Sequence, residues 1–147
     1  MADKKISQSI RKKVAFRANF RCEYCQTPQD HAPGFFEIEH IFPIGKGGTS
    51  SFDNLAFACD GCNNLKSDKT DGVDPSTGQS SALFHPRLDL WDQNFAWDMD
   101  FLNIIGISPK GRTTVELLQL NRQPLINLRR ALFSIGIHPP SKKGLTF

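Results

Sequence analysis

The sequence predicts a small α+β fold, and three observations lead to this prediction. First, 147 residues with 39% hydrophobic and 22% charged content suffice for one compact domain and are too few for two full-sized ones. Second, the four cysteines fall into two pairs with identical spacing. Third, the segment around these pairs has the pattern of two short strands followed by a helix. We therefore expect a single domain over residues 1–147, with its core at about 20–70.

Composition restricts the class of protein. The sequence has no run of about 18 apolar residues, and its first residues, MADKKISQSIRKK, lack the apolar segment of a signal peptide. These observations predict a cytoplasmic protein that neither spans a membrane nor is secreted.

Charge is distributed unevenly along the chain, although the formal net charge is only +3. Residues 1–21 and 101–147 each contain seven basic residues and one acidic residue, whereas residues 22–100 contain thirteen acidic and four basic ones. Cationic ends beside an acidic centre suit an enzyme that cuts phosphodiesters. Two solvated helix faces rich in Lys and Arg give the same pattern, so charge alone does not choose between these interpretations.

The cysteine pairs predict a structural zinc site. They are Cys22 with Cys25, and Cys59 with Cys62. A two-residue gap lets both sulfurs of one turn face the same ion, and two such turns supply four thiolates in a tetrahedron. Disulfides are less consistent with a chain that has no secretion signal, and a thioredoxin-like redox site would need only one pair. The ion would hold both ends of the segment 26–58 in place.

The segment around the second pair changes pattern three times. Residues 36–41 contain β-branched and aromatic residues in partial alternation, which predicts a strand with Glu39 and His40 at its end. The glycine-rich residues 43–50 predict a flexible loop, and residues 55–58 predict a short returning strand. Residues 60–67 predict a helix with Asp60 as its N-cap.

This segment resembles the HNH endonuclease family, whose members are also called His-Me finger or ββα-metal nucleases. The resemblance is carried, in order and between or beside both cysteine pairs, by Glu39-His40-Ile41-x-Pro43, Gly47-Gly48, Asp53-Asn54-Leu55 and Cys59-x-x-Cys62-Asn63-x-x-Lys66. It implies a zinc-stapled ββα-metal core and a divalent-metal-dependent endonuclease that acts on DNA, with RNA not excluded. The extension at about 83–147 is similar to one that accompanies the nuclease core in some bacterial stand-alone members.

Three residues of this segment are the candidates for chemistry. His40 is the candidate general base, because an imidazole titrates near neutral pH and can take a proton from water; a core or zinc-ligand histidine is the alternative. Glu39 and Asn63 offer oxygen ligands to Mg²⁺, Mn²⁺ or another divalent ion. The family more often has Asp at the position of Glu39, so the identity of the ion stays open. The alternatives are a solvent-exposed carboxylate for Glu39 and a helix-capping amide for Asn63, with Asn64 as another possible ligand.

Four further residues have candidate roles beside these groups. The resemblance implies that Asn54 fixes the loop and orients His40, although a turn-forming Asp-Asn pair is an ordinary structural feature. Lys66 would lie on the same helix face as Asn63 and could contact a phosphate, or it could be a solvent lysine. His85 and Arg87 could add a further contact to nucleic acid.

The flanking segments predict additional helices and one hairpin. Residues 7–19 predict a basic amphipathic helix capped by Ser7, and residues 68–82 predict a loop. Trp91, Phe95 and Trp97 are expected in the core, and residues 104–107 predict a strand of a hairpin. After a turn at 108–111, a capping-box pattern at 113–116 predicts a helix. A last helix begins near Pro124 and ends near Gly136.

Two other functions are consistent with the same residues. A zinc-dependent nucleic-acid-binding module that cuts nothing is the first alternative, and a structural or interaction protein is the second. They differ from the nuclease in the absence of cleavage and, for the second, in the absence of affinity for DNA. Nothing in the sequence predicts the oligomeric state.

Overall fold

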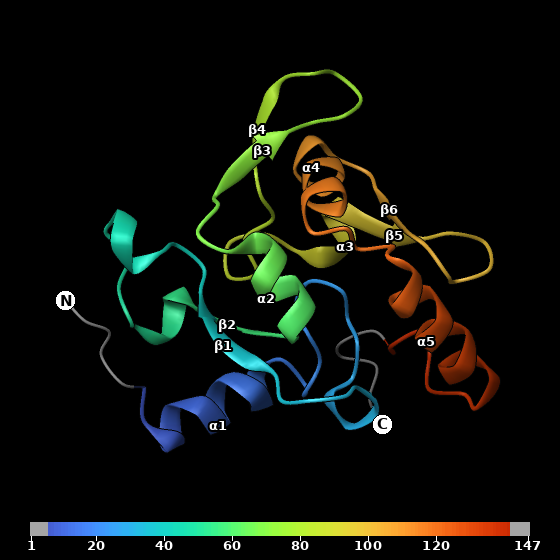
Figure 1. Cartoon of the computed structure of the whole chain (residues 1–147), viewed down its shortest axis with the longest axis horizontal. Helices are drawn as coiled ribbons and strands as arrows, with labels where there is room; N and C mark the ends of the chain where they lie inside the picture. Colours follow the sequence, from blue (N-terminus) through green and yellow to red (C-terminus); the bar gives the residue numbers. More distant parts are fainter. Residues whose placement is uncertain (1–5, 142–147) are drawn as a thin grey trace.

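The structure, a computed structural model, describes residues 6–141 of the chain. Within these residues the architecture is mixed α+β, as the sequence predicts, with five α-helices and three two-stranded antiparallel sheets (Figure 1). The helices are α1 (Gln8–Arg17), α2 (Asp60–Lys66), α3 (Trp91–Asn94), α4 (Pro109–Leu117) and α5 (Gln123–Ser134). The strands are β1 (Glu37–His40), β2 (Leu55–Ala58), β3 (Asp71–Val73), β4 (Ser80–Ala82), β5 (Phe95–Trp97) and β6 (Ile104–Gly106).

The central unit is the hairpin β1–β2 followed by α2, which confirms the expected order of strand, loop, strand and helix. His40 pairs with Leu55 and Glu39 with Ala56 in the antiparallel register. Every residue of β2 is buried, and α2 lies against β1 (Figure 1). The expected N-cap of α2 was wrong by one residue. The cap is Cys59, whose Sγ accepts a hydrogen bond from the backbone of Cys62 at 3.4 Å.

Helix α1 packs on β2 and has the predicted cap. The Ser7 hydroxyl accepts a hydrogen bond from the Ile10 amide at 3.2 Å, which satisfies one of the unpaired N–H groups of the first turn. Val14 is fully buried beneath the helix. Most of the remaining side chains of α1 stay at the surface, including Arg11, Lys12 and Lys13, whereas Arg17 is half-buried.

Residues 68–82 form a hairpin, β3–β4, where a loop was expected. The strands are short and their side chains are mostly exposed, so no alternation of apolar and polar residues reveals them. A turn at residues 74–79 closes the hairpin. The carboxylate of Asp74 accepts the Ser76 amide at 2.9 Å and two hydrogen bonds from the Arg112 guanidinium at 3.0 and 2.8 Å. The pKa of Asp74 is lowered to about 2, chiefly by the hydrogen bonds from Arg112.

The extension contains the expected β5–β6 hairpin and the last helix, but α4 begins earlier than predicted. Ser108 is the N-cap of α4, accepting the Gly111 amide at 2.9 Å, and Pro109 follows in the first turn. The Ser-Pro pair is therefore a helix start and not a turn. Thr114 lies inside this helix and is fully buried, and its hydroxyl accepts the Phe84 amide at 2.9 Å. Gly136, with φ of 78°, follows the end of α5 as expected.

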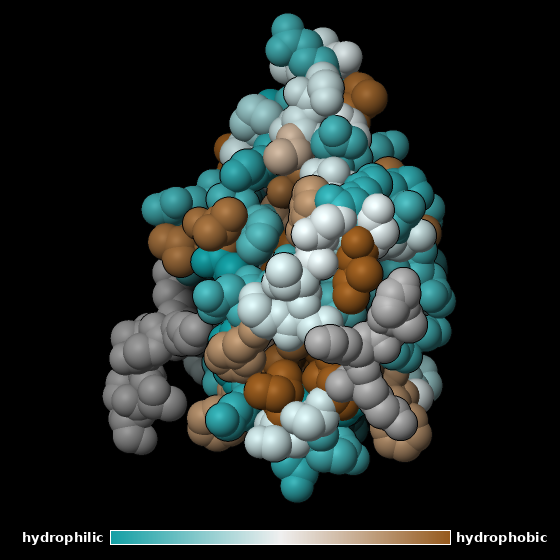
Figure 2. Space-filling model, turned by 90° about the vertical axis from the view of Figure 1, so that its left-hand side faces the viewer, coloured by the Kyte–Doolittle hydropathy of each residue, from teal (hydrophilic) through white to brown (hydrophobic). Residues whose placement is uncertain are grey.

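Most of the buried apolar side chains form one cluster. It extends from Val14 of α1 to Leu125 of α5 and includes all four cysteines. Phe95 is buried, and Trp91 and Trp97 pack against the cluster, as predicted for core aromatics. Hydrophilic side chains cover most of the face that carries the loop 41–54, with apolar patches among them (Figure 2). No helix within residues 6–141 is long and apolar enough to cross a membrane.

Candidate active site

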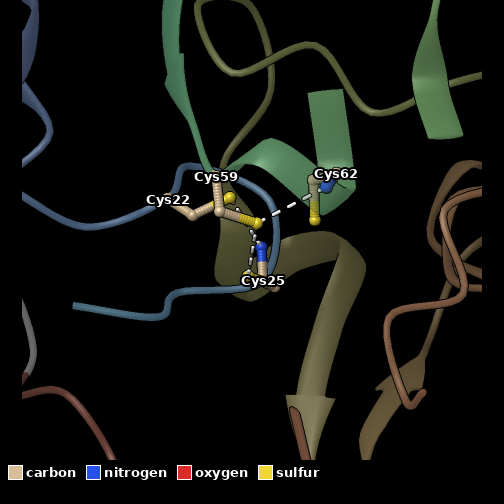
Figure 3. A group of neighbouring side chains, drawn as sticks. All are labelled: Cys22, Cys25, Cys59 and Cys62. Atoms are coloured by element: carbon tan, nitrogen blue, oxygen red, sulfur yellow. Dashed lines mark hydrogen bonds between the residues drawn. The ribbon is translucent and has the colours of Figure 1, made fainter. Parts of the chain in front are cut away.

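The four cysteines meet in a single buried cluster (Figure 3). Their sulfurs all lie within 4.8 Å of one another, and those of Cys25 and Cys59 are 3.7 Å apart. In a zinc tetrahedron with metal–sulfur bonds of about 2.3 Å, the sulfurs lie roughly 3.8 Å apart. In each pair the amide of the second cysteine points at the sulfur of the first, at 3.5 Å for Cys22 and 3.4 Å for Cys59. The cluster could therefore hold zinc, in the arrangement that the spacing predicts.

Arg122, which precedes α5, contacts this cluster from the extension. Its guanidinium nitrogens lie 3.5 Å from the sulfur of Cys59 and 3.6 and 3.7 Å from that of Cys62. Four thiolates around Zn²⁺ leave a net charge of −2, and a neighbouring guanidinium offsets part of it. Gly61 makes room for this contact, because a Cβ there would lie 2.5 Å from a guanidinium nitrogen of Arg122.

The loop between β1 and β2 is held closed by the side chain of Asn54. Its amide nitrogen donates to the carbonyls of Phe42 at 2.9 Å and Thr49 at 2.7 Å, and its oxygen accepts the Phe42 amide at 2.9 Å. One side chain thus ties both ends of the loop together, directly after His40. The loop has no room for a side chain at Gly48, where a Cβ would lie 1.9 Å from the carbonyl oxygen of Phe42.

His40 is the last residue of β1 and directly precedes this loop. Its Nε2 lies 3.0 Å from the hydroxyl oxygen of Ser50, a contact that fixes the orientation of the ring. The four cysteines already account for a complete zinc ligand set, and His40 is not among the residues of that cluster. The structure therefore separates this histidine from the cysteine cluster and makes it a wall of a pocket.

That pocket also contains the two candidate ion ligands. It has a volume of about 660 Å³, and its lining includes Glu39, His40 and Asn63 together with Arg11 of α1. Asn63 reaches it from the first turns of α2. Among the described residues the side-chain amide of Asn63 makes no hydrogen bond, so a helix-capping role finds no support. A carboxylate and an amide are the ligand types that suit a divalent ion with open positions.

Glu39 is buried and held by two partners. Its Oε1 lies 3.2 Å from the ammonium of Lys66, and its Oε2 accepts a hydrogen bond from the Tyr24 hydroxyl. Burial raises the pKa of the Glu39 carboxyl above its ordinary value, and the Lys66 ammonium opposes this shift. Burial also raises the pKa of Tyr24 well above its ordinary value, with a further contribution from Glu39. The hydroxyl of Tyr24 is thus a proton donor to the carboxylate at neutral pH.

The position of Lys66 fits neither role that the sequence left open, a phosphate contact or a solvent lysine. Its side chain is only 2% exposed, and its ammonium also donates to the carbonyl of Ile41 at 2.9 Å. Asn63 lines the pocket beside His40, whereas the side chain of Lys66, three residues later in α2, is buried against Glu39 and Ile41. We infer that Lys66 keeps the Glu39 carboxylate ionised and in place.

Replacing Lys66 with methionine is expected to lower the free energy of unfolding by about 3–5 kcal/mol, because it leaves the Glu39 carboxylate buried without its counter-ion. Urea unfolding followed by circular dichroism measures this change. Lys69→Met, at an exposed position three residues away, is the matched control and should change stability by less than about 0.5 kcal/mol. Adding Glu39→Gln to Lys66→Met should restore part of the loss. A Lys66→Met protein as stable as the control would contradict the assignment.

The side chains of His85 and Arg87 contact other residues of the chain. The Nδ1 of His85 accepts the amides of Arg87 at 3.1 Å and Leu88 at 3.3 Å. The guanidinium of Arg87 forms an ion pair with Glu23, which in turn accepts the Phe57 amide at 2.9 Å. Neither residue lines the pocket beside His40. The nucleic-acid contact expected of them is therefore unsupported, and Arg87 instead ties the extension to the first cysteine pair.

Three residues with candidate functional roles were not predicted from the sequence: Tyr24, Ser50 and Arg122. Tyr24 lies between two cysteines and Ser50 in a polar loop, where neither residue type is unusual. Arg122 is 60 residues from Cys62 in the chain. Only the tertiary structure brings these groups to their partners, and no local spacing signals them.

Comparison with known proteins gives one match. Residues 22–69 match the family model described as HNH endonuclease, and this segment contains both cysteine pairs, β1, β2 and α2. No curated protein and no solved structure shows a significant match to the chain.

Proposed function

We propose that this chain, which carries an HNH endonuclease domain at residues 22–69, is a divalent-metal-dependent endonuclease that hydrolyses DNA phosphodiester bonds. The observation that carries the proposal is the shared pocket of Glu39, His40 and Asn63. It combines a base candidate with two oxygen ligands beside a loop that Asn54 holds closed. The coarser conclusion, a role in nucleic-acid chemistry, rests on the family match.

The residues have distinct tasks in this proposal. His40 takes a proton from the attacking water as the water oxygen bonds to phosphorus and the bond to the leaving sugar oxygen breaks. The contact with Ser50 and the loop held by Asn54 fix the imidazole before substrate binds, so that little reorganisation is needed during the reaction.

Glu39 and Asn63 would hold the catalytic ion, Mg²⁺, Mn²⁺ or another divalent ion. When bound, this ion supplies positive charge that offsets the developing charge on the phosphate and leaving oxygens. Lys66 and Tyr24 hold the two oxygens of the Glu39 carboxylate, so an ion bound here would share the carboxylate with these partners or replace them. Glu39 in place of the more frequent Asp adds one methylene, which moves the ligand oxygens and affects the choice of ion.

Incubation of the purified protein with supercoiled plasmid tests the proposal. We expect nicked or linear plasmid when Mg²⁺ or Mn²⁺ is added and none without a divalent ion. Zn²⁺ is tested as a third ion. A DNA strand and an RNA strand of equal length are also compared, to determine which nucleic acid is cut. Plasmid binding without cleavage in any of these ions would instead identify a non-catalytic nucleic-acid-binding module. Absence of both binding and cleavage would support a structural protein.

A further inference from the structure

An aromatic groove lies beside α1. It has a volume of about 840 Å³, and the rings of Phe16, Phe20 and Phe52 form much of its wall. These residues are 72%, 47% and 37% exposed, respectively. Scattered apolar residues on a surface need no explanation, but several large rings around one groove are typical of a binding site. The family match does not include α1 or Phe20.

The groove is formed by ordered contacts. The rings of Phe16 and Phe20 meet edge to face, with their centroids 6.2 Å apart. Phe20 has φ of 58° and follows Asn19 with φ of 56°, a left-handed conformation that bulky residues rarely adopt. Arg17 stacks over the Phe52 ring, 3.8 Å from its centroid, and donates to the Phe52 carbonyl at 2.9 Å. The rings are therefore positioned before any ligand arrives.

The rim of the groove is cationic. Arg11, Lys12, Lys13 and Arg17 all line it, and α1 contains no acidic residue. The side chains of Arg11, Lys12 and Lys13 lie in solvent. A groove with aromatic walls and a basic rim complements a ligand that has flat apolar faces joined by negative charges.

Arg11 connects this groove to the candidate active site, because the residue lines both pockets. Along the helix axis, Phe16 lies roughly 8 Å from Arg11, given a rise of about 1.5 Å per residue. A strand whose phosphate sits beside His40 can therefore continue past Arg11 and reach the aromatic rings within a few nucleotides.

We propose that the groove binds unpaired bases of the nucleic-acid substrate next to the cut phosphate, so that the preferred substrate is DNA with a single-stranded segment. This inference rests on the proposed function. Bases in a duplex are stacked on one another, whereas unpaired bases are free to stack on phenylalanine rings while basic side chains bind their phosphates. An acidic peptide would also match the charge, but the continuity of the groove with the phosphodiester pocket favours a nucleic-acid strand.

Binding of labelled oligonucleotides tests the inference. Fluorescence anisotropy compares a single-stranded oligothymidylate of about 12 nucleotides, within the usual site size of such grooves, with a blunt duplex of equal length. Divalent ions and chelators are both omitted, which prevents cleavage and leaves the cysteine cluster intact. We expect the full chain to bind the single strand more tightly, and Phe16→Ala/Phe20→Ala to weaken this binding at least about tenfold, since stacking contributes about 1–3 kcal/mol per base. Phe35→Ala, at a ring that is 87% exposed outside the groove, is the matched control and should change binding less than about twofold.

A second pair of variants separates stacking from apolar contact. An oligonucleotide containing 2-aminopurine loses fluorescence when its base stacks on a ring. Phe16→Tyr should retain this quenching and Phe16→Leu should reduce it. Equal quenching by both variants, equal affinity of wild type for duplex and single strand, or a double variant that binds like wild type would each overturn the proposal.

Sedimentation velocity tests whether a second copy of this chain occupies the groove. A wild-type dimer that becomes monomeric in Phe16→Ala/Phe20→Ala would show that a second copy fills the groove, which also overturns the proposal. Nicking of plasmid by the wild-type protein is a separate readout. If nicking is present and the phenylalanine variants bind like wild type, the groove assignment fails and the nuclease assignment stands. If nicking is absent and single-strand binding depends on the rings, the nuclease assignment fails and the groove assignment stands.

Discussion

Replacing His40 with alanine is expected to lower the rate of metal-dependent plasmid nicking by about 10²- to 10⁴-fold, the usual contribution of a positioned general base. The reason is the position of the imidazole. It lies in the pocket with Glu39 and Asn63 and 3.0 Å from Ser50, and no other histidine lines that pocket among the described residues. Nicking rates measured at saturating Mg²⁺ or Mn²⁺ check this expectation.

The control is His31→Ala. His31 is exposed in the short helical turn Gln29–His31 and does not line the pocket beside His40, so its removal should leave nicking within about twofold of wild type, as for a surface substitution away from the site. The His40→Ala protein should keep its circular dichroism spectrum and its affinity for plasmid, since the change removes chemistry and not the fold. Equal nicking by wild type and His40→Ala would remove His40 from the mechanism.

The core of the fold follows from short-range patterns in the sequence. The cysteine pairs, the partial alternation before His40 and the glycines after it are local signals, and they correspond to the cysteine cluster, to β1 and to the loop between β1 and β2, respectively. Asn54 was expected to fix the loop, and its three hydrogen bonds to Phe42 and Thr49 do so. An amide in this place needs only neighbouring backbone groups, which explains why a local motif was enough to find it.

Burial of charged residues could not be read from the same patterns. Helix spacing places Lys66 with Asn63 and left two roles open, a phosphate contact or a solvent lysine, but spacing does not say which helix face packs on a strand. The buried ion pair with Glu39 depends on the distance between α2 and β1, which is a tertiary quantity. The hairpin β3–β4 was missed for a related reason. Its turn is tied to α4 by the Asp74–Arg112 pair, whose members are 38 positions apart.

Replacing Cys62 with serine is expected to abolish zinc binding and, with it, the cooperative folded state. Cys62 is fully buried at the start of α2, and its sulfur contacts the Arg122 guanidinium. Structural zinc contributes an apparent 10–16 kcal/mol in zinc-finger peptides, whereas the entire stability of a domain is about 5–15 kcal/mol. Because the cluster belongs to the same buried core as α1, β2 and the extension, its loss should affect all of them and not the HNH segment alone.

Mass spectrometry under native conditions and thermal unfolding measure these two quantities. We expect one tightly held zinc per wild-type chain and a single unfolding transition, and neither in Cys62→Ser. Ala56→Ser is the matched control, because it adds a hydroxyl at another fully buried position without touching a sulfur, and should cost only about 1–3 kcal/mol. A Cys62→Ser protein that unfolds at the wild-type temperature would show that the cysteine cluster does not hold the fold together. Loss of zinc with retention of the transition would confine the role of the ion to the geometry around His40 and Asn63.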